Sequence, residues 1–75
     1  MEYKVYVKTN EQGDVVDINS EIFMTDKQKK EWTLIDKGEG DRYAHAQGNY
    51  LDGPLYDVNG RPRYKLSNGS ITRKA

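Results

Sequence analysis

Hydrophobic and polar positions alternate at the start of the chain. Tyr3, Val5 and Val7 share one face of an extended backbone while Lys4 lies on the other, which predicts a half-buried β-strand over residues 2–9. The sequence Asn-Glu-Gln-Gly-Asp follows, and it has the glycine and the short polar side chains of a turn. We therefore expect the chain to reverse direction directly after this first strand.

The apolar run over residues 15–19 predicts the returning strand of an antiparallel hairpin. Its register is open, because the pattern allows either Val16 and Ile18 or Val15 alone to face the core. The choice matters, since a slip of one residue moves every side chain of a strand to the opposite face.

The pattern is less regular in the middle of the chain. Residues 20–31 hold an apolar Ile-Phe-Met followed by polar residues, so we expect a turn or two of helix capped by Thr25 or Asp26, or a loop. Residues 32–36, Trp-Thr-Leu-Ile-Asp, predict a short strand. The two glycines in residues 37–40 predict a tightly bent or mobile connection after it.

A short helix of about two turns is predicted over residues 41–47. Asp41 is placed to cap its first turn, and Gly48 stands where a glycine ends a helix. Such a helix puts Tyr43 and Gln47 on one face, because residues four apart are neighbours on a helix surface.

The last third of the chain contains two Asn-Gly pairs, which are the strongest short-range signal for a hairpin turn. They predict three successive strands of a meander: Leu55–Val58, Arg63–Ser67 and Ser70–Arg73. Pro62 cannot donate to a ladder, so it is expected at a strand start or on an edge. The whole pattern predicts one small α+β domain over residues 1–75, mainly antiparallel hairpins and meander with one short helix.

Composition narrows the classes of function. The chain has 75 residues with no cysteine and one histidine, which excludes a disulfide framework and a thiolate or multi-histidine zinc site. The mean hydropathy is −1.01, and no apolar run approaches the roughly 20 residues that cross a bilayer. The first residues do not resemble a signal peptide, so we expect a protein made in the cytoplasm. So short a chain has a small core, which docking or self-association would stabilise.

The charges balance overall but are unevenly placed. Residues 1–40 hold six bases and nine acids, whereas residues 41–75 hold six bases and three acids. The end of the chain carries five bases and no acid: Arg61, Arg63, Lys65, Arg73 and Lys74. Because a basic edge attracts phosphates, a small nucleic-acid-binding or regulatory protein that uses this edge with Tyr64 is the alternative function.

Two segments suggest chemistry and then lack the spacing that it needs. Residues 36–41 carry three acids around two glycines, but the positions are not those of a calcium loop or a phosphate loop. His45 has no serine in a nucleophile-elbow context, so we expect it to pack on Tyr43 or Tyr50, or to donate to a backbone carbonyl. We therefore predict no enzyme activity, no catalytic residue, no metal site and no cofactor.

Residues 32–51 read Trp-Thr-Leu-Ile-Asp-Lys-Gly-Glu-Gly-Asp-Arg-Tyr-Ala-His-Ala-Gln-Gly-Asn-Tyr-Leu, and this segment resembles a known family. It is similar to a stretch that recurs in small tail-region proteins of phages and prophages of Gram-positive bacteria, associated with tail fibres and baseplates. The likeness continues through residues 54–66. The resemblance implies a context of tail structure or host attachment, and thus a structural or accessory module made in a bacterial cytoplasm and incorporated in the virion tail. It supplies no catalytic residue.

The same segment holds most of the residues expected to bind a partner. Trp32 and Leu34, on one strand face, are expected to form the aromatic centre of the fold with Tyr43 and Tyr50. Residues with aromatic area or hydrogen-bonding groups are the partner-binding candidates: Tyr43, His45, Gln47, Asn49, Tyr50 and Tyr64.

The expected partners are other tail or baseplate proteins, or a second copy of the chain. Exposed sheet edges and tyrosines are expected to make the contact, because both can pair with a partner at a wet surface. Nucleic acid is the less favoured partner, and no membrane is expected. A cell-wall glycan bound through Trp32 or the tyrosines is a third alternative, which the attachment context alone suggests.

Overall fold

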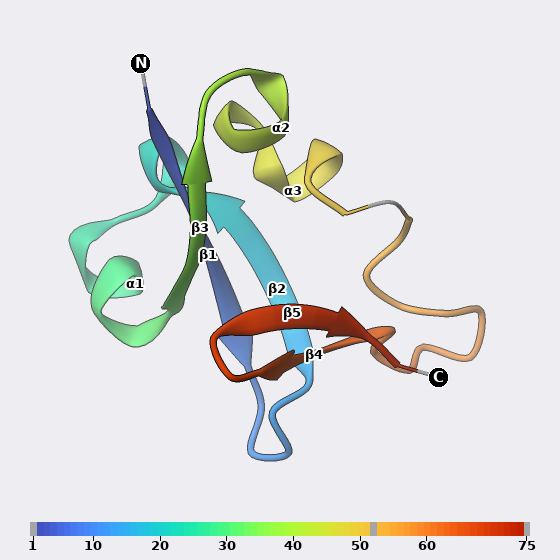
Figure 1. Ribbon diagram of the computed structural model, residues 1–75. Coiled ribbons are helices and arrows are strands. Elements are labelled where there is room, and N and C mark those ends of the chain that lie inside the picture. Colours follow the sequence, from blue (N-terminus) through green and yellow to red (C-terminus); the bar gives the residue numbers. More distant parts are fainter. Residues whose placement is uncertain (1, 52, 75) are drawn as a thin grey trace.

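Two antiparallel sheets and several short helices make up the fold in a computed structural model, which describes residues 2–51 and 53–74 (Figure 1). The elements are β1 (Tyr3–Thr9), β2 (Val15–Ser20), the 3-10 helix η1 (Glu21–Phe23), α1 (Asp26–Glu31), β3 (Thr33–Gly38), α2 (Asp41–Ala44), α3 (Ala46–Asn49), β4 (Tyr64–Ser67) and β5 (Ser70–Arg73). The first three strands form a sheet in the order β2-β1-β3, and the β4–β5 hairpin crosses its lower end. The fold is α+β and mainly β, as the sequence predicts.

The predicted N-terminal hairpin is confirmed, and a bulge fixes its register. Thr9 of β1 pairs with Val15, which leaves Val16 as an extra residue in β2. Because of this extra residue, Val15 and Ile18 are both buried whereas Val16 is half-buried. Each of the two predicted registers was wrong in part, since strict alternation cannot bring Val15 and Ile18 to the same face.

The helical turn predicted within residues 20–31 is confirmed as α1, with Thr25 as its N-cap. The Thr25 hydroxyl accepts a hydrogen bond from the Gln28 N–H at 3.1 Å, and the Gln28 side chain accepts one from the Thr25 N–H at 2.9 Å. This reciprocal capping satisfies backbone donors at the helix start, which is why a helix forms in a segment with no buried residue.

The strand predicted at residues 32–36 is confirmed as β3, with a bulge of its own. Tyr6 of β1 pairs with Leu34, and Ile35 is an extra residue. Leu34 therefore lies on the outer face, 46% exposed, while Ile35 packs against the core. Trp32 is the half-buried C-cap of α1. The prediction that Trp32 and Leu34 lie at the centre of the fold was wrong, because the bulge turns Leu34 outward.

The single helix predicted over residues 41–47 was wrong, because two one-turn helices stand there. His45 separates α2 from α3, with φ −126° and ψ 54°. The buried side chain of Ser20, in β2, forms hydrogen bonds with the backbone on both sides of His45. The N-cap of α2 is Gly40 and not Asp41, which is the first helical residue. Gly48 lies within α3 instead of ending it.

The two Asn-Gly pairs form different turns. Asn68 and Gly69 have φ values of 52° and 78° and make the two-residue loop of the predicted β4–β5 hairpin, which is confirmed. In the other pair, Gly60 has a positive φ of 79° but Asn59 does not, because Asn68 is the only non-glycine residue with a positive φ in the described part of the chain. Within the described residues, the strand predicted over Leu55–Val58 is reduced to an isolated bridge between Tyr56 and Pro62. The bonds that flank this bridge join other residues, from the Arg63 N–H to the Leu55 carbonyl and from the Asp57 N–H to the Arg61 carbonyl, so proline is tolerated there.

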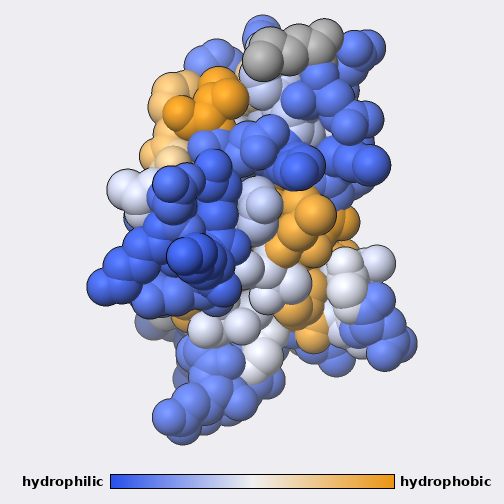
Figure 2. All heavy atoms as spheres, turned by 90° about the vertical axis from the view of Figure 1, so that its left-hand side faces the viewer, coloured by the Kyte–Doolittle hydropathy of each residue, from blue (hydrophilic) through white to orange (hydrophobic). Residues whose placement is uncertain are grey.

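One hydrophobic core joins the three-stranded sheet, α3 and β4. Its buried members are Val5, Val7, Val15, Ile18, Ala46 and Tyr64. The β4–β5 hairpin is also tied to the β1–β2 turn, because the Leu66 N–H donates to the Gly13 carbonyl at 2.9 Å. The side of the molecule that carries α1 is mostly hydrophilic, with two separate hydrophobic areas (Figure 2). None of the helices in the described residues has the length and apolar composition needed to cross a membrane.

Candidate functional site

Most of the candidate residues lie on the helical corner, which we define as α2, His45 and α3. Ser20, fully buried at the end of β2, fixes this corner to the sheet. Its hydroxyl donates to the Tyr43 carbonyl and accepts from the Ala46 N–H at 2.7 Å. These two backbone groups stand on either side of His45, so the hydrogen bonds to Ser20 explain why the helix breaks there.

Tyr43 and Tyr50 face one another across the inner side of the corner. Their rings are in a T-shaped arrangement with centroids 5.9 Å apart, and the Arg42 guanidinium lies 4.4 Å from the centroid of the Tyr50 ring. The Tyr50 hydroxyl donates to Oδ2 of Asp36 at 2.8 Å. Burial, and then the bond to the Asp36 carboxylate, raise the pKa of Tyr50 to about 12. Both tyrosines are half-buried, and these contacts hold the corner against β3.

The glycines before α2 serve this packing in two different ways. A Cβ atom on Gly38 would lie 2.6 Å from Cε2 of Tyr43, so only glycine leaves room for the ring. Gly40 has a φ of 96° and open space around it, so glycine is needed there for the backbone conformation. The predicted bend thus leaves room for the Tyr43 ring at Gly38 and then turns the chain into α2 at Gly40.

His45 and Gln47 face outward from the corner. The His45 ring packs on Phe23 of η1, with centroids 5.6 Å apart and an angle of 32° between the ring planes. The prediction that His45 packs on Tyr43 or Tyr50 was wrong, because the break between α2 and α3 turns it toward η1. Five residues line a hollow of about 380 Å³, here called the aromatic hollow: Asn19, Phe23, His45, Gln47 and Gly48.

The two remaining candidates lie apart from the aromatic hollow. Asn49 is exposed at the end of α3 and does not line it. Tyr64 is 5% exposed in the core, and the Arg63 guanidinium lies 5.5 Å from its ring centroid. The expectation that the Tyr64 ring meets a partner is therefore corrected, since that ring is interior packing of this chain.

Three residues of the aromatic hollow were not among the predicted candidates: Asn19, Phe23 and Gly48. Phe23 is the largest of them. Its side chain is 57% exposed, and that of its neighbour Ile22 is 49% exposed. The sequence signal was the apolar triplet Ile-Phe-Met before a polar helix, which fits a buried turn and an exposed patch equally well. Only the packing of η1 beside the corner distinguishes the two.

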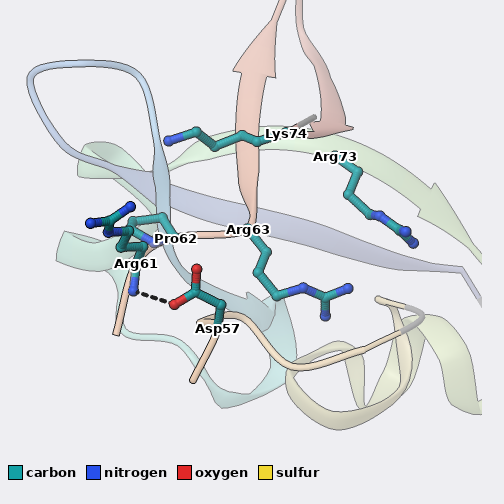
Figure 3. A pocket seen from close by; sticks show the side chains of 6 residues that line it. All are labelled: Asp57, Arg61, Pro62, Arg63, Arg73 and Lys74. Atoms are coloured by element: carbon teal, nitrogen blue, oxygen red, sulfur yellow. Dashed lines mark hydrogen bonds between the residues drawn. The ribbon is translucent and has the colours of Figure 1, made fainter. Parts of the chain in front are cut away.

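A second hollow, of about 460 Å³, lies at the C-terminal hairpin and is here called the basic hollow (Figure 3). Its lining residues are Asp57, Arg61, Pro62, Arg63, Arg73 and Lys74. It brings together four of the five bases that the sequence marks at the end of the chain. The Asp57 carboxylate accepts from the N–H groups of Arg61 at 3.0 Å and Asn59 at 2.8 Å. The hydrogen bond from Arg61 and then that from Asn59 hold the pKa of Asp57 below its usual value.

Within residues 2–51 and 53–74, no three side chains among His, Cys, Asp and Glu come together in a way that would hold a metal ion. No family model, curated protein sequence or solved structure matches the chain. The two hollows are thus the surface features from which a function is inferred.

Proposed function

We propose that the chain is a non-enzymatic binding module that docks on another structural protein through the aromatic hollow. The setting we propose is the tail of a phage or prophage, which is the context that the resemblance of residues 32–51 and 54–66 implies. A tail-fibre or baseplate protein is then the partner, and the module contributes contacts and no chemistry.

The exposure of Phe23 beside His45 is the observation that carries this proposal. In a chain with one phenylalanine and few apolar residues, that ring is 57% exposed at the rim of a hollow. Asn19 and Gln47 add amide groups around it. An aromatic anchor surrounded by polar groups is the usual composition of a binding hot spot, because burial of the ring supplies energy while the amides fix orientation.

The sheet edges support docking less well than the sequence analysis expected. On β2, the N–H groups of Ile18 and Ser20 donate to the side chains of Asp17 and Asn19, at 2.8 and 2.9 Å. On β3, the Lys37 N–H donates to the side chain of the preceding aspartate at 2.8 Å. A strand added at either edge would have to displace these bonds, so side-chain contacts at the aromatic hollow are the better route.

The alternative function, binding of nucleic acid along the basic edge, has weaker support. The sequence analysis expected Tyr64 to bind nucleic acid together with this edge, but the Tyr64 ring is buried. Arg63 donates through Nη1 to the Pro54 carbonyl at 2.8 Å, and Nζ of Lys74 lies 3.1 Å from Oδ1 of Asp14. Two of the bases thus already have partners within the chain, which lowers their gain from a run of phosphates.

The test measures binding of the purified chain to recombinant tail-fibre and baseplate proteins of the phage that encodes it, by biolayer interferometry. Phe23→Ser should weaken binding at least about tenfold, because an aromatic hot spot contributes more than about 1.4 kcal/mol. Val58→Ser is the matched control, since Val58 is 100% exposed on a distant turn and should not matter. Circular dichroism confirms that each variant is folded.

Binding should also persist at moderate salt, because apolar contacts are not screened as charges are. Equal affinities for Phe23→Ser and wild type would show that the aromatic hollow is not part of the interface. Binding that vanishes between low and physiological salt would favour the charged alternative.

A further inference from the structure

The fold itself does not explain the glycine at position 48. This residue lies inside α3, where glycine makes a helix less stable than alanine does. Its φ is not positive, and a Cβ atom built on it would meet no described atom within 4 Å. Neither the backbone conformation nor packing within the described residues therefore requires glycine at this position.

The place of Gly48 beside Phe23 and His45 indicates what the missing side chain allows. All three residues line the aromatic hollow, whose volume of about 380 Å³ is that of a small-ligand pocket. A side chain at position 48 would take up part of this space, whereas glycine lets a ligand approach the α3 backbone closely. The glycine thus keeps the hollow open, although it weakens the helix.

Asn19 supplies hydrogen-bond donors of fixed orientation at the same hollow. Its Oδ1 accepts from the Ser20 N–H at 2.9 Å, so the end of β2 sets the plane of the amide. This leaves the two N–H donors on Nδ2 for a ligand, and Gln47 adds a second, exposed amide. A ligand segment that presents carbonyl oxygens fits this arrangement.

The lining also narrows the chemistry of the ligand. None of the lining residues is an Asp, Glu, Lys or Arg, so a charged group would enter the hollow without a counter-ion. The rings of Phe23 and His45 have centroids 5.6 Å apart and an angle of only 32° between their planes, so they form one aromatic wall. A flat, apolar and uncharged group can pack against such a wall.

We propose that the aromatic hollow binds a proline-containing segment of the partner protein in the polyproline II conformation. Proline has no N–H and this conformation has no internal hydrogen bonds, so the segment presents carbonyl oxygens to Asn19 and Gln47. Its pyrrolidine rings pack on the aromatic wall, and its backbone passes close to Gly48. Aromatic-lined grooves bind such segments well because the ligand is ordered before it binds. This inference rests on the proposed docking through the aromatic hollow and names the part of the partner that enters it.

The test is a titration of the full chain, labelled with ¹⁵N, with the synthetic peptide acetyl-Pro-Pro-Leu-Pro-Pro-Leu-amide, followed by backbone amide shifts. Saturable shifts should be confined to the lining of the aromatic hollow and its immediate neighbours. The control peptide acetyl-Ala-Ala-Leu-Ala-Ala-Leu-amide should bind about tenfold more weakly, because its backbone must be ordered on binding.

Gly48→Ala gives the sharpest result, because stability and binding should change in opposite directions. Alanine is the better helix former, so the urea midpoint should rise, while the added methyl group should weaken peptide binding about tenfold. Asn49→Ala is the matched control, since Asn49 is exposed in the same helix and outside the hollow and should leave the affinity unchanged. Loss of structure cannot explain weaker binding in a variant that is more stable.

Asn19→Asp tests the donors. The carboxylate still accepts from the Ser20 N–H, but the N–H donors on the side chain are gone, so peptide binding should weaken about tenfold. A dispersed amide spectrum shows that the variant is folded. Wild-type affinity in the folded variant would contradict recognition of the segment's carbonyl oxygens.

Three results would overturn the proposal: equal affinities for the two peptides, wild-type affinity in Gly48→Ala, or a lower urea midpoint in that variant, which would mean that the fold requires the glycine. Binding of tail proteins separates this inference from the function on which it rests. If Phe23→Ser weakens binding of a tail protein but Gly48→Ala does not, docking stands and proline recognition fails. If the proline peptide binds in a Gly48-dependent way and no tail protein binds, proline recognition stands and the proposed tail partner is wrong.

Discussion

The three-stranded sheet with its helical corner and the C-terminal segment of residues 53–74 are stabilised in different ways. Four aliphatic side chains of β1 and β2 are at most 2% exposed: Val5, Val7, Val15 and Ile18. The C-terminal segment buries one large side chain, Tyr64, and leaves Val58 fully exposed. Its other contacts with the core come from partly buried side chains, namely Leu55, Leu66 and Ile71. Polar contacts add to them, such as the Tyr56 hydroxyl donating to the Val16 carbonyl at 2.9 Å.

Equal hairpin signals in a sequence therefore do not imply equal stability. The N-terminal hairpin forms the wall of the core, so its strands are stabilised by burial. The C-terminal hairpin buries less, because Leu66 and Ile71 are only half-buried while Lys65 and Thr72 face solvent. We expect the C-terminal segment to open locally at a lower free energy than the sheet, with faster amide exchange.

A substitution at Ile18 should reduce stability most. Ile18→Ala should lower the free energy of unfolding by about 2–5 kcal/mol, because it leaves a cavity in the packed core. Ile71→Ala in β5 removes the same atoms from a half-buried site and should cost about 1 kcal/mol. Urea unfolding measures both. Equal losses would mean that the two regions are stabilised alike.

The next effect is at Ser20, which links the sheet to the helical corner. Ser20→Ala leaves the Ala46 N–H and the Tyr43 carbonyl without their partner, at an expected cost of about 1–3 kcal/mol. Ser67→Ala is the matched control, since Ser67 is exposed at the end of β4 and should change stability by less than about 0.5 kcal/mol. Amide exchange at Ala46 should accelerate in the first variant and stay unchanged in the second.

The sequence pattern predicted which strands and helices form better than it predicted which of their side chains are buried. Ser20 shows why. Strand periodicity and Asn-Gly pairs are local signals, and they located β1, the first hairpin and the β4–β5 hairpin. The break at His45 depends on a hydroxyl more than 20 residues earlier in the chain, so no local pattern contains it. The bulges at Val16 and Ile35 likewise reflect which side chains fill the core, a choice that periodicity alone does not determine.

The candidate site was predicted to a similar degree. Residues 32–51 were identified as the segment that holds most of the candidates. The sequence did not separate Tyr43 and Tyr50, which hold the corner against β3, from His45, which lies in the aromatic hollow. Phe23 was missed because its exposure follows from the position of η1. Arg63 and Lys74 lie next to one another in the basic hollow because of the register of the β4–β5 hairpin, which the Asn-Gly turn does predict.

Tyr50 provides a pH test of the corner alone. Its raised pKa means that folding favours the neutral phenol, so this contribution is complete below pH 10.0 and is lost as the pH rises toward about 12. Tyr50→Phe should cost about 1 kcal/mol at neutral pH and remove that part of the alkaline loss of stability. Asp36→Asn should lower the pKa of Tyr50, as measured by the ultraviolet absorbance of tyrosinate. An unchanged pKa would show that the Asp36 carboxylate has little influence on the phenol.

The smallest effect separates the two Asn-Gly turns within the C-terminal segment. Asn68 has a φ of 52°, where alanine is strained, so Asn68→Ala should cost about 0.5–1 kcal/mol. Asn59 does not have a positive φ, and its backbone N–H still donates to the Asp57 carboxylate after substitution, so Asn59→Ala should change stability by only about 0.3 kcal/mol. The two variants remove the same side chain from the same dipeptide. A difference between them in urea unfolding would therefore report the backbone conformation of the turn, whereas equal costs would mean that the side-chain amides stabilise both turns in the same way.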